Sequence, residues 1–212
     1  MRLLLLYGVN CTTKIWDRIK PYLNKFEVDY VEYPHEITLK AKKVNDISKW
    51  VYENFNHNYD AVIGHSLGGI IALELVEIYK MKFNKIVMID TNLKPANEFY
   101  RNLMTLENEK EFGKEIFDMF RKEKEFYTNT LFNAIQEDFD YTSYVKEIKQ
   151  KIYVVYGDRN LPNYEKKIDD LNLTDEILKN IDLRFVNNAC HLAMIENPKQ
   201  LYKIIESIVE EG

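Results

Sequence analysis

The segment from Asp60 to Ala72 carries residue types that are suited to covalent catalysis. Ser66 stands between Gly64 and Gly68 in a Gly-x-Ser-x-Gly motif, which three apolar residues directly precede and a long apolar run follows. This order predicts a strand, a sharp turn and a buried helix. Glycine at both flanking positions lets the strand and helix backbones approach closely, so that the serine hydroxyl is held up at the carboxyl end of a sheet. The pattern therefore predicts a serine nucleophile.

The residue after the serine offers a second catalytic element. The backbone N–H of Leu67 is expected at the N-terminus of the helix, where the first N–H groups have no partner within the helix. The helix dipole adds partial positive charge at this end. We therefore expect the Leu67 N–H to stabilise the negative charge that develops on an oxygen during attack by Ser66.

The composition indicates a globular protein of one domain, residues 1–212. Of the 212 residues, 46% are hydrophobic and 30% are charged, and the chain is long enough for a substantial core. The net charge is −5, with basic residues interleaved among acidic ones. This distribution excludes an electrostatic footprint for nucleic acid and a polybasic membrane patch. We expect no nucleic-acid or membrane partner, and nothing in the sequence indicates the oligomeric state.

The apolar runs and the cysteines indicate the compartment. No run approaches the ~18 residues of a membrane span. The apolar part of residues 1–8 is too short for a signal peptide and is more typical of a first strand. Cys11 and Cys190 give neither a disulfide framework nor a metal-ligand spacing. We therefore expect a cytoplasmic protein with two free thiols near the mouth of the active site.

Strands and amphipathic helices alternate along the sequence. Apolar runs predict strands over residues 2–7, 28–33, 61–64, 85–90, 151–156 and 182–186. Helical spacing of apolar residues predicts helices over residues 15–23, 44–55, 67–82 and from 198 onward. This alternation favours parallel βαβ units with right-handed crossovers.

Residues 91–150 interrupt the alternation. They show no strand pattern and are typical of several short helices, which contain seven of the 11 phenylalanines of the chain. An insertion between two strands at the carboxyl edge of a sheet lies above a nucleophile at that edge. We therefore expect a helical cap over residues 91–150, some of whose aromatic side chains line an apolar acyl pocket. Ordinary helical packing is the alternative.

The order of elements and two motifs resemble the α/β-hydrolase family over essentially the whole chain. The motifs are Gly-His-Ser-Leu-Gly at 64–68 and the ending His191-x-x-x-x-Glu196-x-Pro198, each after an expected strand. The family carries its catalytic residues in the chain order serine, acid, histidine. The resemblance implies a three-layer α/β fold with a six-stranded parallel sheet in the order 2-1-3-4-5-6, helices on both faces and a helical cap insertion.

The resemblance assigns roles to two further positions. His191 is expected to take the proton of Ser66 and pass it to the leaving group, because an imidazole titrates near neutral pH. The family takes its second oxyanion donor from the loop after the first strand, which places it at the Val9 N–H. Tyr7 replaces the histidine that is usual in this loop. Because the donor is a backbone group, this change need not abolish the oxyanion hole.

The acid is where the sequence departs from the family. The usual aspartate position, three residues after the glycine that ends the strand, is occupied by Asn160. Three hypotheses stay open: Asp158 turns inward as the acid, Asp90 at the end of the fourth strand reaches the histidine, or Asn160 stands in without a charge. Asp158 is the preferred candidate because it lies in the same loop, only two residues away.

The residues together predict a serine hydrolase that cleaves a small carboxylic ester or thioester through an acyl-enzyme. No metal or organic cofactor is implied, and short to medium acyl chains are favoured. Carbon–carbon bond hydrolases of the same family share the serine turn, so the fold alone does not choose among these reactions. A catalytically weak homologue that binds a small ligand without converting it is the alternative from a different class.

Overall fold

The computed structural model describes residues 1–136 and 139–211, and its centre is a six-stranded parallel sheet in the order β2-β1-β3-β4-β5-β6. This strand order and the parallel direction confirm the prediction from the sequence. The strands are β1 (Arg2–Leu6), β2 (Glu27–Tyr30), β3 (Ala61–His65), β4 (Lys85–Ile89), β5 (Ile152–Gly157) and β6 (Ile181–Val186).

The register of the strands brings their carboxyl ends to one edge. His65 at the end of β3 pairs with Ile89 at the end of β4. Ile89 pairs in turn with Val155, two residues before the end of β5, and the last residues of β5 and β6 pair with each other. The loops that follow β3, β4, β5 and β6 therefore leave the sheet side by side, which is where ligands bind in open parallel sheets.

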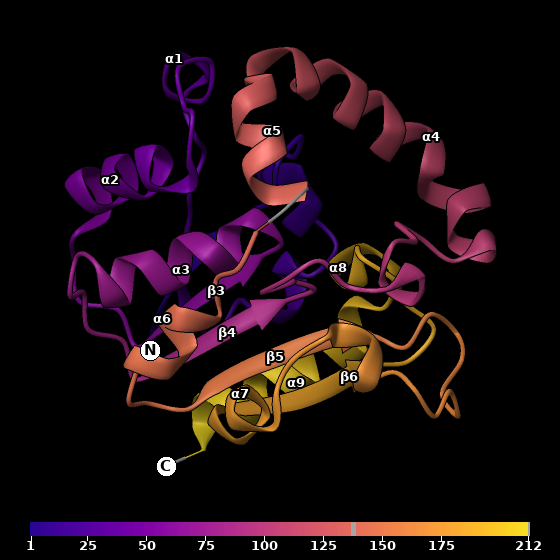
Figure 1. Cartoon of the computed structure of the whole chain (residues 1–212). Coiled ribbons are helices and arrows are strands. Elements are labelled where there is room, and N and C mark those ends of the chain that lie inside the picture. Colours follow the sequence, from indigo (N-terminus) through magenta and orange to yellow (C-terminus); the bar gives the residue numbers. More distant parts are fainter. Residues whose placement is uncertain (137–138, 212) are drawn as a thin grey trace.

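Helices cover both faces of the sheet, and the core lies between these layers. The residues of β3 and β4, apart from Lys85, are buried, as expected for strands covered on both sides. Figure 1 shows α3 (Leu67–Glu77) across the near face and α9 (Pro198–Glu210) behind the sheet. Helix α2 (Val44–Phe55) packs on α3, at the position predicted from its apolar stripe.

Three predicted elements differ from the structure. Residues 15–23 form two short 3₁₀ turns, η1 (Thr13–Trp16) and η2 (Lys20–Tyr22), because Pro21 lacks the N–H that an α-helix needs. Helix α3 ends at Glu77 rather than near residue 82. Strand β2 ends at Tyr30, which pairs with Leu5 of β1, rather than at residue 33. The remaining short helices before β4 and after β5 are α1 (His35–Thr38), η5 (Asp169–Leu171), α7 (Asp175–Asn180) and α8 (Ala193–Glu196).

The segment between β4 and β5 is helical throughout its regular elements. It contains η3 (Glu98–Tyr100), α4 (Leu106–Glu123), η4 (Lys124–Phe126), α5 (Asn129–Gln136) and α6 (Thr142–Glu147). Figure 1 shows α4 and α5 arching away from the sheet, whereas α6 returns to pack on α3. None of the described helices combines the length and the apolarity that crossing a membrane requires.

Candidate active site

The turn between β3 and α3 holds Ser66 in a strained conformation. Its φ is 52° and its ψ is −120°, values that residues other than glycine rarely adopt. A Cβ atom on Gly64 would lie 2.2 Å from the carbonyl oxygen of Gly68, and one on Gly68 would lie 2.3 Å from that of Leu6. Thr91 Oγ1 donates a hydrogen bond of 2.9 Å to the Ser66 carbonyl oxygen. Close backbone packing therefore fixes the turn.

Replacing Gly64 by alanine is expected to destabilise the fold by about 1–3 kcal/mol or more, because the added methyl group meets backbone atoms that cannot rotate away. Gly113→Ala in α4 is the matched control. The atom nearest to its added Cβ is Cγ of the Glu109 side chain at 2.9 Å, which can move, and alanine favours a helix. Urea unfolding followed by circular dichroism compares the two variants. Equal midpoints would contradict the expectation.

The loop after β1 brings a second backbone donor to the serine. A Cβ atom on Gly8 would lie 2.8 Å from the Ser66 Cβ, so the loop passes directly against the serine. Val9 and Leu67 both line the cavity that contains Ser66. Within the described part of the chain, neither of their N–H groups donates a hydrogen bond to a backbone carbonyl. The role of these two N–H groups as oxyanion donors stays a prediction.

Tyr7, at the position where the resemblance leads one to expect a histidine, anchors the same loop. Its hydroxyl accepts a hydrogen bond of 2.8 Å from the Tyr33 N–H and donates one of 3.1 Å to Glu32 Oε1. The Tyr33 hydroxyl donates to the Tyr7 carbonyl oxygen at 3.2 Å. Glu32 also accepts from the N–H and the hydroxyl of Thr13, at 3.1 and 2.7 Å. The loop is thus tied to the segment after β2 at both ends and keeps its position without a histidine.

His191 is paired with the carboxylate of Asp90. Nδ1 of His191 lies 2.9 Å from Oδ1 of Asp90, which directly follows β4 and is fully buried. His191 lies in the loop between β6 and α8, and its side chain is 21% exposed. Because an ionised carboxylate only accepts hydrogen bonds, Nδ1 carries the proton and Nε2 is the basic nitrogen. Among the three acid hypotheses, the geometry therefore places Asp90 at the histidine.

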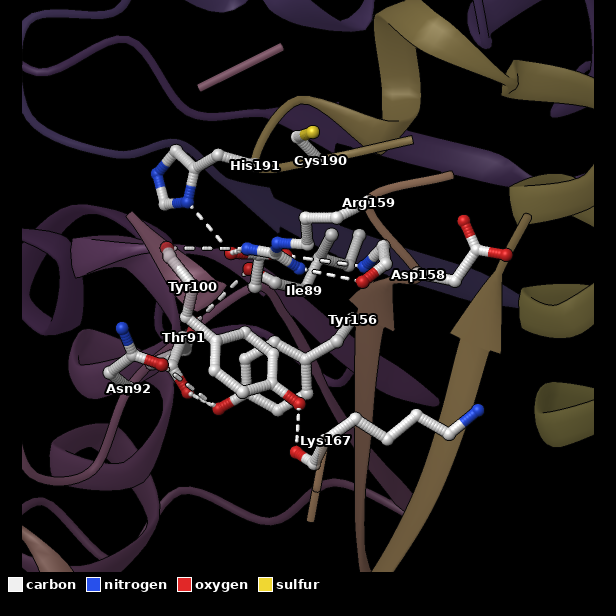
Figure 2. A network of polar contacts seen from close by, with 12 residues as sticks. Ile89, Thr91, Asn92, Tyr100, Tyr156, Asp158, Arg159, Lys167, Cys190 and His191 are labelled. Atoms are coloured by element: carbon white, nitrogen blue, oxygen red, sulfur yellow. Dashed lines mark hydrogen bonds and ion pairs between the residues drawn. The ribbon is translucent and has the colours of Figure 1, made fainter. Parts of the chain in front are cut away.

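The structure corrects the preference for Asp158 as the acid. Asp158 Oδ1 accepts hydrogen bonds from the N–H groups of Asn160 at 2.9 Å and Asn188 at 2.7 Å. Figure 2 shows its carboxylate pointing away from His191. The side chain therefore stabilises the loop after β5 instead of reaching the imidazole. Asn160 is exposed, at a φ of 58°, and its side chain makes no hydrogen bond to His191.

Arg159 also binds the Asp90 carboxylate. Its Nη1 and Nη2 donate to Oδ2 and Oδ1, each at 2.8 Å, and the Gly157 N–H donates to Oδ2 at 3.2 Å. Burial alone would raise the pKa of Asp90, but the charge of Arg159 and the hydrogen bond and charge of His191 outweigh it and hold this pKa well below its usual range. Asp90 is therefore ionised at neutral pH. Nothing in the sequence pointed to Arg159, because no spacing rule links it to a residue 69 positions earlier.

His65, inside the serine motif, is packed beneath His191. Its Nε2 donates a hydrogen bond of 3.0 Å to the His191 carbonyl oxygen, and the two ring centroids are 4.7 Å apart. Burial, with a further contribution from the neighbouring His191, lowers the pKa of His65 to about 3. His65 is therefore neutral, and its hydrogen bond supports the backbone of His191.

Both cysteines are free and buried near the candidate site. Cys11 lines the cavity of Ser66, and Cys190 lines a neighbouring cavity. Burial raises the pKa of Cys190 to about 12 and that of Cys11 further, so both remain thiols and are poor nucleophiles. Glu196 accepts the Cys190 N–H at 2.6 Å and the Thr105 N–H at 2.7 Å. This carboxylate joins the loop of the histidine to the start of α4.

The candidate catalytic groups line one cavity of about 620 Å³. The segment between β4 and β5 supplies much of its apolar wall, and two of its phenylalanines, Phe120 and Phe139, take part. Other aromatic side chains of this segment pack elsewhere: Phe126 stacks on His35 with ring centroids 3.6 Å apart. No group of three or more histidine, cysteine, aspartate or glutamate side chains within residues 1–136 and 139–211 is arranged to hold a metal ion.

Comparisons with known proteins identify the fold of this chain through solved structures of low sequence identity. No protein-family model and no curated protein matches the sequence. Solved structures match over nearly the whole chain. A hydrolase from Oleispira antarctica has a TM-score of 0.78 and 14% identity, covering 100% of this chain and 91% of the other. An α/β-hydrolase enzyme from a lagoon-sediment metagenome has a TM-score of 0.65 and 16% identity, covering 98% and 89%.

A third similar structure is the thioesterase domain from the curacin biosynthetic pathway, with a TM-score of 0.67 and 12% identity, covering 97% of this chain and 90% of the other. The chain therefore has the α/β-hydrolase fold. At this identity the likeness establishes the fold alone, so the reaction has to be argued from the site.

Proposed function

We propose that this protein is a serine hydrolase that cleaves a small carboxylic ester or thioester through an acyl-enzyme. One observation carries the proposal: His191, held by the buried Asp90 carboxylate at 2.9 Å, lines the same cavity as Ser66 on its strained turn. Nucleophile, base and acid in one cavity are the arrangement that acyl transfer by a serine requires.

The first half of the reaction forms the acyl-enzyme. His191 Nε2 takes the proton of the Ser66 hydroxyl as its oxygen attacks the substrate carbonyl carbon. The carbonyl oxygen becomes an oxyanion, which the N–H groups of Val9 and Leu67 stabilise. The imidazolium that forms is held by Asp90. It then gives its proton to the leaving alcohol or thiol, and the bond from the acyl carbon to that group breaks.

The second half regenerates the enzyme. A water molecule gives one proton to His191 Nε2 and attacks the acyl carbon, and the same two N–H groups stabilise the second oxyanion. The Ser66 oxygen leaves, takes the proton back from the imidazolium and is ready for another cycle. The carboxylic acid is released. Every step uses residues of this chain and water, and we include no cofactor in the proposal.

We further propose that the segment over residues 91–150 acts as a cap that determines acyl-chain length. Its side chains Leu103, Phe120 and Ile135 line the cavity beside the serine. A cavity of about 620 Å³ with an apolar wall suits a small acyl group.

Activity on p-nitrophenyl esters from acetate to palmitate is therefore expected to peak at short to medium chains. Phe120→Ala removes part of the apolar wall and should move the maximum toward longer chains. Initial rates across the ester series are measured for the wild type and for Phe120→Ala. A wild-type maximum at palmitate would contradict the proposed role of the cavity.

Covalent labelling with a fluorophosphonate probe tests the proposed function itself. The probe reacts with activated serines, so intact-mass spectrometry should show one equivalent bound to the wild type and none to Ser66→Ala. Ser143→Ala, which removes an exposed hydroxyl of α6, is the matched control and should label as the wild type does. An unlabelled wild type would overturn the hydrolase proposal and favour the ligand-binding homologue. Labelling without ester or thioester turnover would favour carbon–carbon bond cleavage instead.

A further inference from the structure

We propose that Arg159 is a positioning residue of this site, which orients the Asp90 carboxylate toward His191 and offsets its negative charge. The inference rests on the proposed hydrolase function and concerns the pair that moves the proton. The inference is drawn from the contacts of the Arg159 guanidinium and not from a sequence motif.

The guanidinium meets the carboxylate through two parallel hydrogen bonds. Nη1 donates to Oδ2 and Nη2 to Oδ1 of Asp90, each at 2.8 Å, while His191 Nδ1 reaches the same Oδ1 at 2.9 Å. Figure 2 shows the side chains of Arg159 and His191 close together at this network. A planar two-pronged contact fixes the plane of a carboxylate. It therefore also fixes the direction from which Oδ1 accepts the imidazole N–H.

The ion pair is enclosed by protein. The side chains of Arg159 and Asp90 are 1% and 0% exposed. Nη1 also donates to the Gly157 carbonyl oxygen at 2.7 Å, and the guanidinium carbon lies 4.6 Å from the centroid of the Tyr100 ring. Compared with apolar side chains of similar volume, a buried ion pair often contributes no net stability. Net stability therefore does not account for the ion pair as a whole, and its contact with His191 favours a role in the site.

The backbone of Arg159 supports the same role. Its N–H donates a hydrogen bond of 2.8 Å to the carbonyl oxygen of Ala189, two residues before His191. Arg159 and Asp90 have φ values of 56° and 43°, in the left-handed region that is costly for side-chain-bearing residues. Two strained residues thus meet at one ion pair beside the histidine. Arg159 holds the carboxylate with its side chain and the histidine loop with its main chain.

The arginine also changes the charge that the imidazole faces. A carboxylate paired with a guanidinium attracts an imidazolium less than an isolated carboxylate does. Without the cation, the His191–Asp90 pair would take up a proton more readily, whichever of the two residues held it. The loss of activity on the acid side would then begin at a higher pH. We therefore expect Arg159 to hold the acid limb of the activity profile at a lower pH.

Other titratable groups surround this pair from each neighbouring element. They are Tyr100 in η3, Tyr156 in β5, Cys190 and Glu196 after β6, and His65 in β3. Burial raises the pKa values of Tyr100, Tyr156, Cys190 and Glu196 and lowers that of His65. The carboxylate of Asp158 points away from the pair. All of these groups are retained in the variants that follow, so a difference between the variants reports on Arg159.

The test is the dependence of kcat/KM on pH for two variants of the full chain. Arg159→Gln removes the charge, and we expect the acid limb of the profile to move up by about one pH unit or more. Arg159→Lys keeps the positive charge but loses the two parallel hydrogen bonds to Asp90. We therefore expect kcat to fall about tenfold while the acid limb of the pH profile stays in place. Arg121→Gln on the exposed face of α4 makes the same change in net charge and should leave the profile unchanged.

Two results would overturn the proposal. An acid limb that stays in place in Arg159→Gln, even with a lower kcat, would reduce Arg159 to a structural role. A kcat of Arg159→Lys equal to that of the wild type would contradict the proposal that Arg159 orients the Asp90 carboxylate. If Arg159→Gln does not fold, Arg159→Lys still decides, because a shifted limb in a variant that keeps the charge contradicts the electrostatic argument.

A failure of the hydrolase proposal is recognised separately, by an unlabelled wild type in the fluorophosphonate experiment. In that case NMR titration of the imidazole signals replaces kinetics. The chain has four histidines, and His191→Ala identifies the relevant signal. Its midpoint is expected at higher pH in Arg159→Gln than in the wild type or Arg159→Lys. Equal midpoints in the three proteins would overturn the inference on Arg159 independently of any activity.

Discussion

His191→Ala is expected to lower kcat on an activated ester by about 10⁶-fold, the largest loss that any single substitution in this chain should cause. The serine hydroxyl keeps its proton near neutral pH unless a base accepts it, and Nε2 of His191 is the basic nitrogen of the Asp90-bound imidazole. Ser66→Ala should cause a similar loss. Because the two residues act as one unit, the double variant should be no slower than either single variant.

Steady-state kinetics with p-nitrophenyl butyrate, at a pH where the wild type is fully active, measures these losses. His57→Ala is the matched control, since His57 is exposed and lies away from the cavity, and its kcat should equal that of the wild type. His191→Ala with a tenth of the wild-type rate would show that another group serves as base. Losses that multiply in the double variant would show that Ser66 and His191 act in separate steps.

The fold was largely predictable because each element carries its own local pattern. The buried run from Leu3 to Leu6 and the stripe of α2 have the periods of a covered strand and an amphipathic helix. Residues 15–23 show where such patterns fail. Their apolar side chains are buried as a helical stripe would be, but 3₁₀ and α-helical turns place them so similarly that the spacing does not separate the two.

The candidate site was predictable only where neighbours in sequence are neighbours in space. Ser66 and Leu67 follow from one motif, since the turn that exposes the hydroxyl also places the N–H beside it. The acid did not follow, because Asp90 and Asp158 each directly follow a strand at the same sheet edge and both are compatible with the pattern. Which of them turns toward the histidine depends on left-handed backbone conformations at non-glycine residues, which the sequence does not mark.

Asp90→Asn is therefore the substitution that decides between the two carboxylates, and we expect it to lower kcat by about 10⁴-fold. An amide in place of the carboxylate carries no charge to stabilise the imidazolium, and its NH₂ group favours the wrong tautomer of His191. Asp158→Asn is the matched control. It leaves the contact between Asp90 and the imidazole untouched, so its kcat should fall less than about tenfold.

The stability of Asp90→Asn has to be separated from its activity, because the substitution leaves the buried Arg159 without its counter-ion. Breaking a buried pair in this way costs about 3–5 kcal/mol. The double variant Asp90→Asn, Arg159→Gln removes both charges and should recover most of that stability in urea unfolding while the activity stays low. If the double variant recovered activity as well, the loss in Asp90→Asn would be one of folding. A larger kcat loss in Asp158→Asn than in Asp90→Asn would return the role of acid to Asp158, in spite of its hydrogen bonds to the backbone of its own loop and of Asn188.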